Sequence, residues 1–278
     1  MTFEEEILKV IKKQKLSPKE AQLVLKNLKK PHSKYYEKHI DFPDKHTKFL
    51  VIADPHMGHK EYKHDLKQKA AADARRQNCD FGLNIGDTVE GMSGIEGHVY
   101  ELDYIGYTAQ VDFFAKEFHF GMPMYSIEAQ DSHSGWYHNK GNAGVEIGKE
   151  LDKKAKDYKF IGYDEQDLIL DNGLKIRLRH PGGGTAYAIS YKLQKYINSI
   201  SGGNKPHMIF EGHFHKSMQM FDRNIHAFES GTLCGQTNFM KKIGTPAHMG
   251  YWMIDVYMHK QKSKGLERVV SQWIPYFV

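Results

Sequence analysis

The sequence FLVIADPH, residues 49–56, indicates the fold class because an apolar run stops abruptly at an aspartate and a histidine. Five apolar residues in a row are typical of a buried strand, and Asp54 and His56 follow where that strand would end. Three further apolar runs end in the same way, at Gly86-Asp87, at His180 and at Gly212-His213-Phe214-His215. Ligand sites in open α/β sheets form at the carboxyl ends of strands. The four endings therefore predict one shared crevice in an α/β fold.

The side chains at these endings suit a metal centre. Imidazoles and carboxylates together bind borderline divalent ions such as Mn, Fe, Zn, Co and Ni. Asp87, which follows a glycine turn, is placed to bridge two ions about 3.5–4 Å apart. One such motif in a chain with 17 histidines would be incidental. Four motifs in this order favour a metal centre over solvated or hydrogen-bonded histidines.

The ordered motifs resemble those of the calcineurin-like metallophosphoesterase superfamily, from about residue 48 to the C-terminus. Residues 180–195 also resemble a phage and prophage branch of that superfamily. The resemblance implies an α/β (α+β) fold, a metallophosphoesterase-type β-sandwich of two mixed sheets flanked by helices. It implies a metal-dependent phosphoesterase with two divalent ions, manganese first, and a hydroxide between the ions that attacks phosphorus. The implied ligands are Asp54, His56, Asp87 and His215 for one ion, and Asp87, Gln130, His180 and His213 for the other.

One motif departs from the family pattern. Ala129-Gln130-Asp131 stands where the family has Gly-Asn-His, so Gln130 replaces a metal-binding asparagine and Asp131 replaces the histidine that protonates the leaving group. His133, two residues further on, is the alternative proton donor, and a solvated loop histidine is the other interpretation of it. Glu90 replaces the second aspartate of Gly-Asp-x-x-Asp, a mild change because Asp87 is the implied bridge.

Three glycines, Gly182, Gly183 and Gly184, follow His180 and precede a helix predicted from about residue 185. Such glycines let backbone amides approach a phosphate at a helix N-terminus, and a flexible turn is the equal alternative. We expect a phosphodiester substrate, with DNA or RNA before a cyclic or small nucleotide. Two alternatives stay open. One is a catalytically impaired metal-binding module for nucleic acid or a protein partner, and the other is a phosphomonoesterase.

The first 33 residues have the pattern of a separate unit. Capping boxes at Thr2 and Ser17 precede two apolar stripes at helical spacing, and Pro31 ends the second stripe. We expect a helical hairpin, similar to part of a helix-turn-helix, at 1–33, a polar linker at 34–47 and the metallophosphoesterase domain at 48–278. Residues 1–48 carry the whole net charge of +5. This positive charge is compatible with binding to a polyanion, and lysines that are simply solvated are the commoner explanation. For the hairpin itself, we prefer packing on the catalytic domain or a second subunit over DNA recognition.

Composition excludes several protein classes. Apolar residues make up 40% of the 278 residues, which is enough for a core. The charged N-terminus does not resemble a signal peptide, and no window approaches about 18 uninterrupted apolar residues. We therefore expect a soluble cytoplasmic protein without a membrane partner, in the host cytoplasm if a phage encodes it. Cys79 and Cys234 are expected to be reduced thiols. The sequence indicates no oligomeric state.

The remaining patterns predict alternating helices and strands. Helices are expected at 63–78, 99–118, 145–157 and 186–199. Strands in the second half are expected at 167–170, 174–179, 207–210, 224–229, 250–257 and 268–274. This mixture agrees with two sheets faced by helices.

Overall fold

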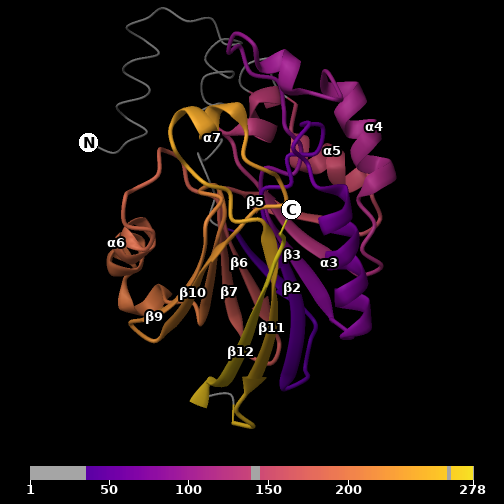
Figure 1. The fold of residues 1–278 in the computed structure, drawn as a ribbon. Helices are drawn as coiled ribbons and strands as arrows, with labels where there is room; N and C mark the ends of the chain where they lie inside the picture. The colour runs from indigo at the N-terminus through magenta and orange to yellow at the C-terminus, as the bar shows by residue number, and fades with distance from the viewer. Residues whose placement is uncertain (1–35, 139–144, 262–263, 278) are drawn as a thin grey trace, which may run out of the picture. The chain divides into compact units, whose positions relative to one another are not determined.

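The computed structural model of the chain describes residues 36–138, 145–261 and 264–277. Within these ranges the chain forms two mixed six-stranded sheets flanked by helices (Figure 1). The expected α/β fold with two mixed sheets is therefore confirmed. The helical hairpin expected at 1–33 lies outside the described residues. Within the described part of the chain, no helix is both long enough and apolar enough to span a membrane.

The first sheet, called sheet A, has the strand order β1-β6-β7-β8-β10-β9. Its strands are β1 (Tyr36–Ile40), β6 (Glu165–Leu170), β7 (Lys175–Arg179), β8 (Met208–Glu211), β10 (Ile225–Ser230) and β9 (Ser217–Asp222). β7, β8 and β10 run parallel, whereas β6 is antiparallel to β7 and β9 is antiparallel to β10. The carboxyl ends of β7 and β8 therefore lie at the same end of sheet A.

The second sheet, called sheet B, has the strand order β12-β11-β2-β3-β4-β5. Its strands are β12 (Leu266–Pro275), β11 (Gly250–Met258), β2 (His46–Ile52), β3 (Phe81–Ile85), β4 (Met124–Glu128) and β5 (Tyr158–Tyr163). β2 to β5 run parallel, and β11 and β12 complete the sheet in antiparallel fashion. The carboxyl ends of β2 and β3 are thus also adjacent.

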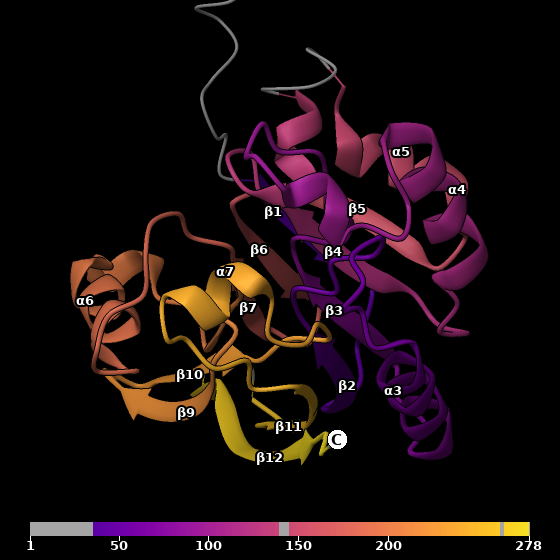
Figure 2. The same ribbon diagram turned by 45° about the horizontal axis from the view of Figure 1, so that its top comes forward.

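The helices connect these strands. The α-helices are α3 (His64–Arg76), α4 (Tyr107–Glu117), α5 (Ile147–Lys154), α6 (Tyr191–Ser199) and α7 (Asn238–Lys242). Short 3-10 helices are η1 (His98–Glu101), η2 (His133–Gly135) and η4 (Gly202–Asn204). Figure 2 shows α6 on one side of the sheets and α3, α4 and α5 on the other.

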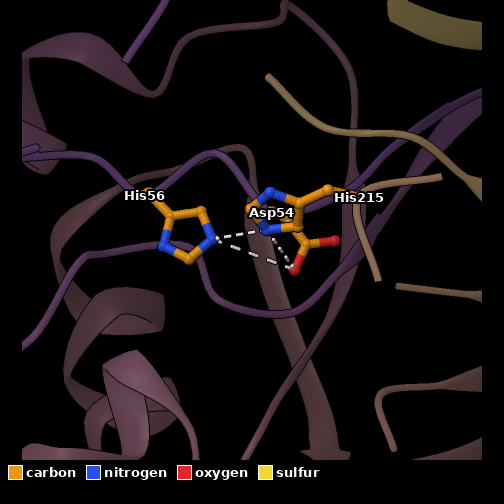
Figure 3. A group of neighbouring side chains, drawn as sticks. All are labelled: Asp54, His56 and His215. Carbon is orange, nitrogen blue, oxygen red and sulfur yellow. Dashed lines mark hydrogen bonds and ion pairs between the residues drawn. The ribbon is translucent and has the colours of Figure 1, made fainter. Parts of the chain in front are cut away.

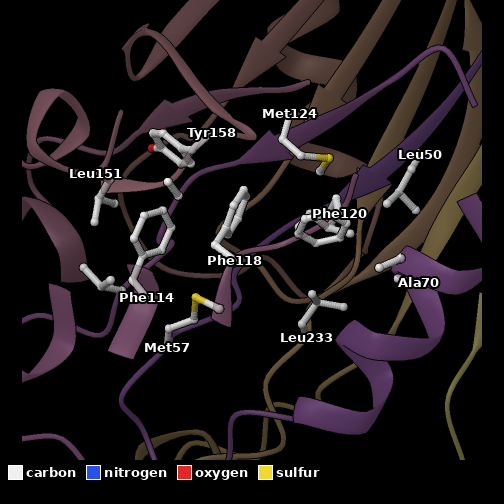
Figure 4. Packing of buried hydrophobic residues seen from close by; sticks show 14 of the residues in the cluster. Leu50, Met57, Ala70, Phe114, Phe118, Phe120, Met124, Leu151, Tyr158 and Leu233 are labelled. Carbon is white, nitrogen blue, oxygen red and sulfur yellow. The ribbon is translucent and has the colours of Figure 1, made fainter. Parts of the chain in front are cut away.

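The alternation of side chains along β2 separates two layers of the core. Phe49 and Val51 belong to the apolar cluster between the sheets, which also contains Phe210 of β8. Leu50 and Ile52 point the other way, because successive side chains of a strand face opposite sides of its sheet. They join the cluster that packs α3, α4 and α5 onto sheet B, part of which Figure 4 shows.

The outer face of sheet A has a smaller core of its own. Leu193 and Ile197 of α6 are buried against Ile209 of β8 and Ala227 of β10. In the described part of the chain, α6 thus covers the outer face of sheet A, and α3, α4 and α5 cover the outer face of sheet B. This layering leaves the carboxyl ends of β2, β3, β7 and β8 free to carry side chains of the site.

Three expectations about elements need correction. The linker expected at 34–47 contains β1, which pairs in parallel with β6, and the first residues of β2. The helix expected at 99–118 is shorter, because Gly106 at φ 86° precedes α4. The helix expected from about residue 186 begins at Tyr191. Periodicity and composition alone do not fix where an element begins, which explains all three differences.

Candidate metal centre

Residues at the ends of four strands meet where the two sheets come together. Asp54 follows β2 and Asp87 follows β3, whereas His180 follows β7 and His213 comes shortly after β8. The backbone N–H of Asp54 donates to the carbonyl of Gly86 at 3.2 Å, which ties the first two strand ends together. His180 reaches across from sheet A, since its Nδ1 lies 2.6 Å from the Ile85 carbonyl. The strand ends that were expected to share one crevice therefore lie close together.

Asp54, His56 and His215 form the first group of candidate ligands (Figure 3). The Nε2 atoms of His56 and His215 are 3.0 Å apart. Asp54 Oδ1 lies 4.0 Å from His56 Nε2 and 3.6 Å from His215 Nε2. The backbone N–H of His213 donates to both oxygens of Asp54, at 3.0 and 2.9 Å, and fixes the carboxylate. Two imidazoles and one carboxylate thus converge on a single point.

Asp87, His180 and His213 form the second group, with one ligand atom of each within 4.8 Å of the others. His180 Nε2 lies 3.2 Å from Asp87 Oδ2. Burial opposes charge on His180, but the negative charges of Asp87 and Asp54 outweigh it and raise the pKa of His180 to about 10. Burial, helped by His180, lowers the pKa of His213 to about 4. A neutral imidazole is the form that binds a metal, so His213 is in that form at pH 7 and His180 would release a proton when an ion binds.

The backbone at these residues is unusual. A left-handed φ is uncommon for residues other than glycine and costs about 1–3 kcal/mol at each position. It occurs here at candidate ligands, namely Asp54 (48°), His56 (51°), Asp87 (47°), His213 (77°) and His215 (54°). Strain of this kind persists only where the surrounding structure holds it, and it is concentrated at functional sites. No pattern of residue types predicts this backbone conformation.

Glu90 is buried beside the first group and holds three histidines. His56 Nδ1 lies 2.7 Å from Glu90 Oε2, while His98 Nε2 and His133 Nδ1 lie 2.7 and 3.1 Å from Oε1. Burial alone would raise the pKa of Glu90, but His133 and His56 hold it well below its usual value. A carboxylate behind a ligating histidine fixes the ring and its tautomer. This role of Glu90 goes beyond the mild motif change expected for it, and no motif in the sequence points to His98.

The residues of the altered motif after β4 lie in different environments. Asp131 is exposed, whereas His133 lies beside the centre in a third group with His56 and Asp87. Ser132, which the sequence had not singled out, donates from Oγ to Asp87 Oδ2 at 2.7 Å. Gln130 is half-buried, and its backbone N–H donates to Asp164 at 2.9 Å. Of the two expected proton donors, His133 is grouped with candidate ligands, and Asp131 lies at the surface.

The residues present fit divalent ions. Within the described part of the chain, Asp87 Oδ1 is buried and lacks a hydrogen-bond partner, and His180 Nε2 is buried beside Asp87 Oδ2 at 3.2 Å. Burying such atoms unpaired is unfavourable unless another group, such as a cation, satisfies them. The carboxylates of Asp54 and Asp87 and the neighbouring imidazoles form the mixed oxygen and nitrogen set that borderline divalent ions prefer.

The glycines after His180 are exposed, and only one of them needs to be glycine for its backbone. Gly183 has φ 85°, and its carbonyl lies 2.8 Å from His213 Nε2. A side chain at Gly182 or Gly184 would meet open space. Since α6 begins only at Tyr191, the helix N-terminus that was expected directly after these glycines is displaced along the chain.

No protein-family model matches the chain, and no curated protein matches it. Solved structures do match. An archaeal phosphodiesterase matches 82% of this chain and 100% of its own, with 12% identity and a TM-score of 0.43. YfcE, a phosphoesterase from E. coli, matches 81% of this chain and 98% of its own, with 13% identity and a TM-score of 0.39. Vacuolar protein sorting 29 from Cryptosporidium parvum matches 84% of this chain and 100% of its own, with 12% identity and a TM-score of 0.43. At such identities, function has to be argued from this chain's own side chains.

Proposed function

We propose that this chain is a calcineurin-like metallophosphoesterase that hydrolyses a phosphodiester with two divalent ions, manganese first. The observation that carries the proposal is the convergence of Asp54, His56 and His215 beside Asp87, His180 and His213 at four strand ends, three of which carry strained backbone. A scaffold has no physical need to bury so many ionisable groups beside one another. The phage-type branch rests on residues 180–195 alone, and a cytoplasmic location belongs to the same proposal.

Each ligand has a distinct part in this proposal. Asp54, His56 and His215 would hold one ion, and His180 and His213 the other, with Asp87 shared between them. Bound ions would supply Lewis acidity and a nucleophile at neutral pH. Gln130 would add its side-chain carbonyl as a further ligand. The chain itself keeps these groups in place, through Glu90 behind His56 and through Ser132 on Asp87.

His133 is the proposed proton donor. Its Nδ1 contacts Glu90, so a protonated ring presents Nε2–H to the leaving group. Its side chain is 30% exposed, which leaves room for substrate to reach it. As water oxygen bonds to phosphorus, the bond from phosphorus to the leaving oxygen breaks and that oxygen takes the proton from Nε2. Asp131, at the surface, has no such position.

Hydrolysis of matched substrates tests this function. The manganese-loaded protein would be assayed with bis-p-nitrophenyl phosphate, p-nitrophenyl phosphate, single-stranded DNA and cyclic nucleotides, with Asp87→Ala as the metal-deficient control. We expect the diester to be cleaved faster than the monoester. Faster cleavage of the monoester would indicate a phosphomonoesterase. No turnover at full metal content would indicate a metal-binding module without catalysis.

A further inference from the structure

A pocket of about 350 Å³ lies beside the metal centre. Its volume falls within the range of about 300–1,000 Å³ that is usual for small-ligand sites. The side chains that matter for its chemistry are Tyr187, Ile189, Lys192, Phe214, Lys216 and His248. No described residue in its lining is acidic. The pocket therefore combines apolar surface with positive charge.

The walls of this pocket are attached to candidate metal ligands. Phe214 is buried and stands between His213 and His215 in the chain, with its ring centroid 5.0 Å from that of His213. The carbonyl of Gly183, on the loop that leads into the pocket, lies 2.8 Å from His213 Nε2. On the other side, the backbone N–H of His248 donates to the His215 carbonyl at 2.8 Å. A ligand in the pocket would thus lie next to the metal centre, where the phosphate of a substrate would bind.

The polar groups of the pocket are hydrogen-bond donors. Lys192 Nζ lies 4.9 Å from the centroid of the Phe214 ring, so a cation and an aromatic face are side by side. Lys216 is half-buried and follows His215 directly. His248 Nδ1 accepts a hydrogen bond from the backbone N–H of Ser217 at 3.0 Å, which leaves the hydrogen of a neutral ring on Nε2. These donors match anionic oxygens rather than a cation.

We infer that this pocket binds one nucleoside arm of the phosphodiester, together with a second phosphate carried by that arm. The base would stack on Tyr187, whose side chain is exposed at the pocket, since aromatic faces stack on every base. The second phosphate would lie between Lys192 and Lys216, because charge-assisted hydrogen bonds to phosphate are strong. This inference rests on the proposed function and narrows the substrate to a nucleotide chain.

Three esters that differ by one group at a time test the inference. They are bis-p-nitrophenyl phosphate, thymidine 5′-(p-nitrophenyl phosphate), and the same thymidine ester with a 3′-phosphate. Products would be separated by chromatography, so that cleavage on either side of phosphorus is counted. We expect kcat/KM to rise with each added group. Lys192→Met and Lys216→Met should lower kcat/KM for the 3′-phosphorylated ester by roughly 10- to 100-fold. The loss should be smaller for bis-p-nitrophenyl phosphate, which carries no second phosphate.

Matched controls separate this inference from the function itself. Lys195→Met removes an exposed lysine of α6 that does not line the pocket, and should change none of the three rates. Tyr187→Ala should slow both thymidine esters alike. Direct binding of thymidine 3′,5′-bisphosphate, measured by calorimetry, gives a readout without turnover and should weaken in both pocket lysine variants. Cleavage of bis-p-nitrophenyl phosphate with no preference among the esters, or equal bisphosphate binding by all variants, would overturn the nucleoside pocket. Absence of any cleavage with lysine-dependent binding would overturn only the hydrolytic function.

Discussion

His56 Nδ1 lies 2.7 Å from Glu90 Oε2, and this contact turns the opposite ring nitrogen of His56 toward His215. Both residues are almost fully buried. A histidine that donates Nδ1–H to a carboxylate has its lone pair on Nε2, which is the atom that faces the first ligand group. Glu90 therefore selects the ring orientation that metal binding requires, although it is not itself among the candidate ligands.

Replacement of Glu90 should weaken metal binding without abolishing it. Glu90→Gln keeps the shape but loses the charge that orients His56, so we expect about a 10- to 100-fold loss of affinity for one ion. Competition with a chelating dye would measure it. Glu101→Gln is the matched control, because Glu101 Oε2 lies 3.3 Å from His59, a buried histidine outside the ligand groups. Equal affinity in the two variants would contradict the orienting role.

Replacement of Asp87 should remove metal from both ligand groups. Asp87 contacts His180 at 3.2 Å and also belongs to the group with His56 and His133. We expect about two ions per chain in the wild type, almost none in Asp87→Ala and about one in His56→Ala. Elemental analysis of the purified variants would measure this. Full metal content in Asp87→Ala would rule out the bridging position.

The sequence predicted the strand ends well because each apolar run stops where its side chains leave the core. β2, β3, β7 and β8 all lie close to their expected positions, and their ends bring Asp54, Asp87, His180 and His213 together. Hydrophobic patterning fixes where a buried strand ends, and parallel pairing then fixes which ends are neighbours.

Features that depend on loops were not predictable in this way. Glu90 and Ser132 act through contacts that follow from tertiary packing, and no spacing rule connects either residue with its partner. β1 and β9 are edge strands of sheet A, and their half-exposed, mixed residues lack a clear apolar pattern. The late start of α6 was not predictable either. Residues 186–190 have a composition that suits a helix, but the helix begins only at Tyr191.

Replacement of His133 should affect poor leaving groups selectively. A positioned acid contributes about 10²- to 10⁴-fold when the leaving oxygen needs a proton, and little for a nitrophenol. We therefore expect His133→Ala to slow hydrolysis of dinucleotides by that factor and to leave bis-p-nitrophenyl phosphate nearly unchanged. Asp131→Ala, at an exposed position, should change neither rate. If steady-state kinetics showed that Asp131→Ala slows dinucleotide hydrolysis and His133→Ala does not, Asp131 would be the proton donor.

Gly86 has to be glycine for two reasons: a side chain would not fit there, and its backbone has a positive φ. A Cβ at this position would lie 2.5 Å from His180 Nδ1, on a backbone with φ 87°. Gly86→Ala should therefore displace His180 and release the ion of the second group. Gly173→Ala is the matched control, since Gly173 has φ 98° but its Cβ would meet open space. It should cost about 1–2 kcal/mol of unfolding free energy and leave metal content intact. Denaturation and elemental analysis of both variants would separate strain from displacement.

Glu229 should make the metal-free protein less stable at alkaline pH. Burial, and next the charge of Glu211 on the adjacent strand, raise the pKa of Glu229 from 4.5 to about 9. Its Oε2 has no hydrogen-bond partner among the described residues. Below pH 4.5 the carboxyl is protonated in both states, and as pH rises toward 9 only the unfolded state ionises freely, so stability is lost. Glu229→Gln stays neutral, and we expect it to raise Tm at pH 8.5 by roughly 4 °C or more, with little change at pH 5. Thermal unfolding in chelator at both pH values would measure the difference, and an equal shift at the two would show that packing rather than ionisation sets the effect.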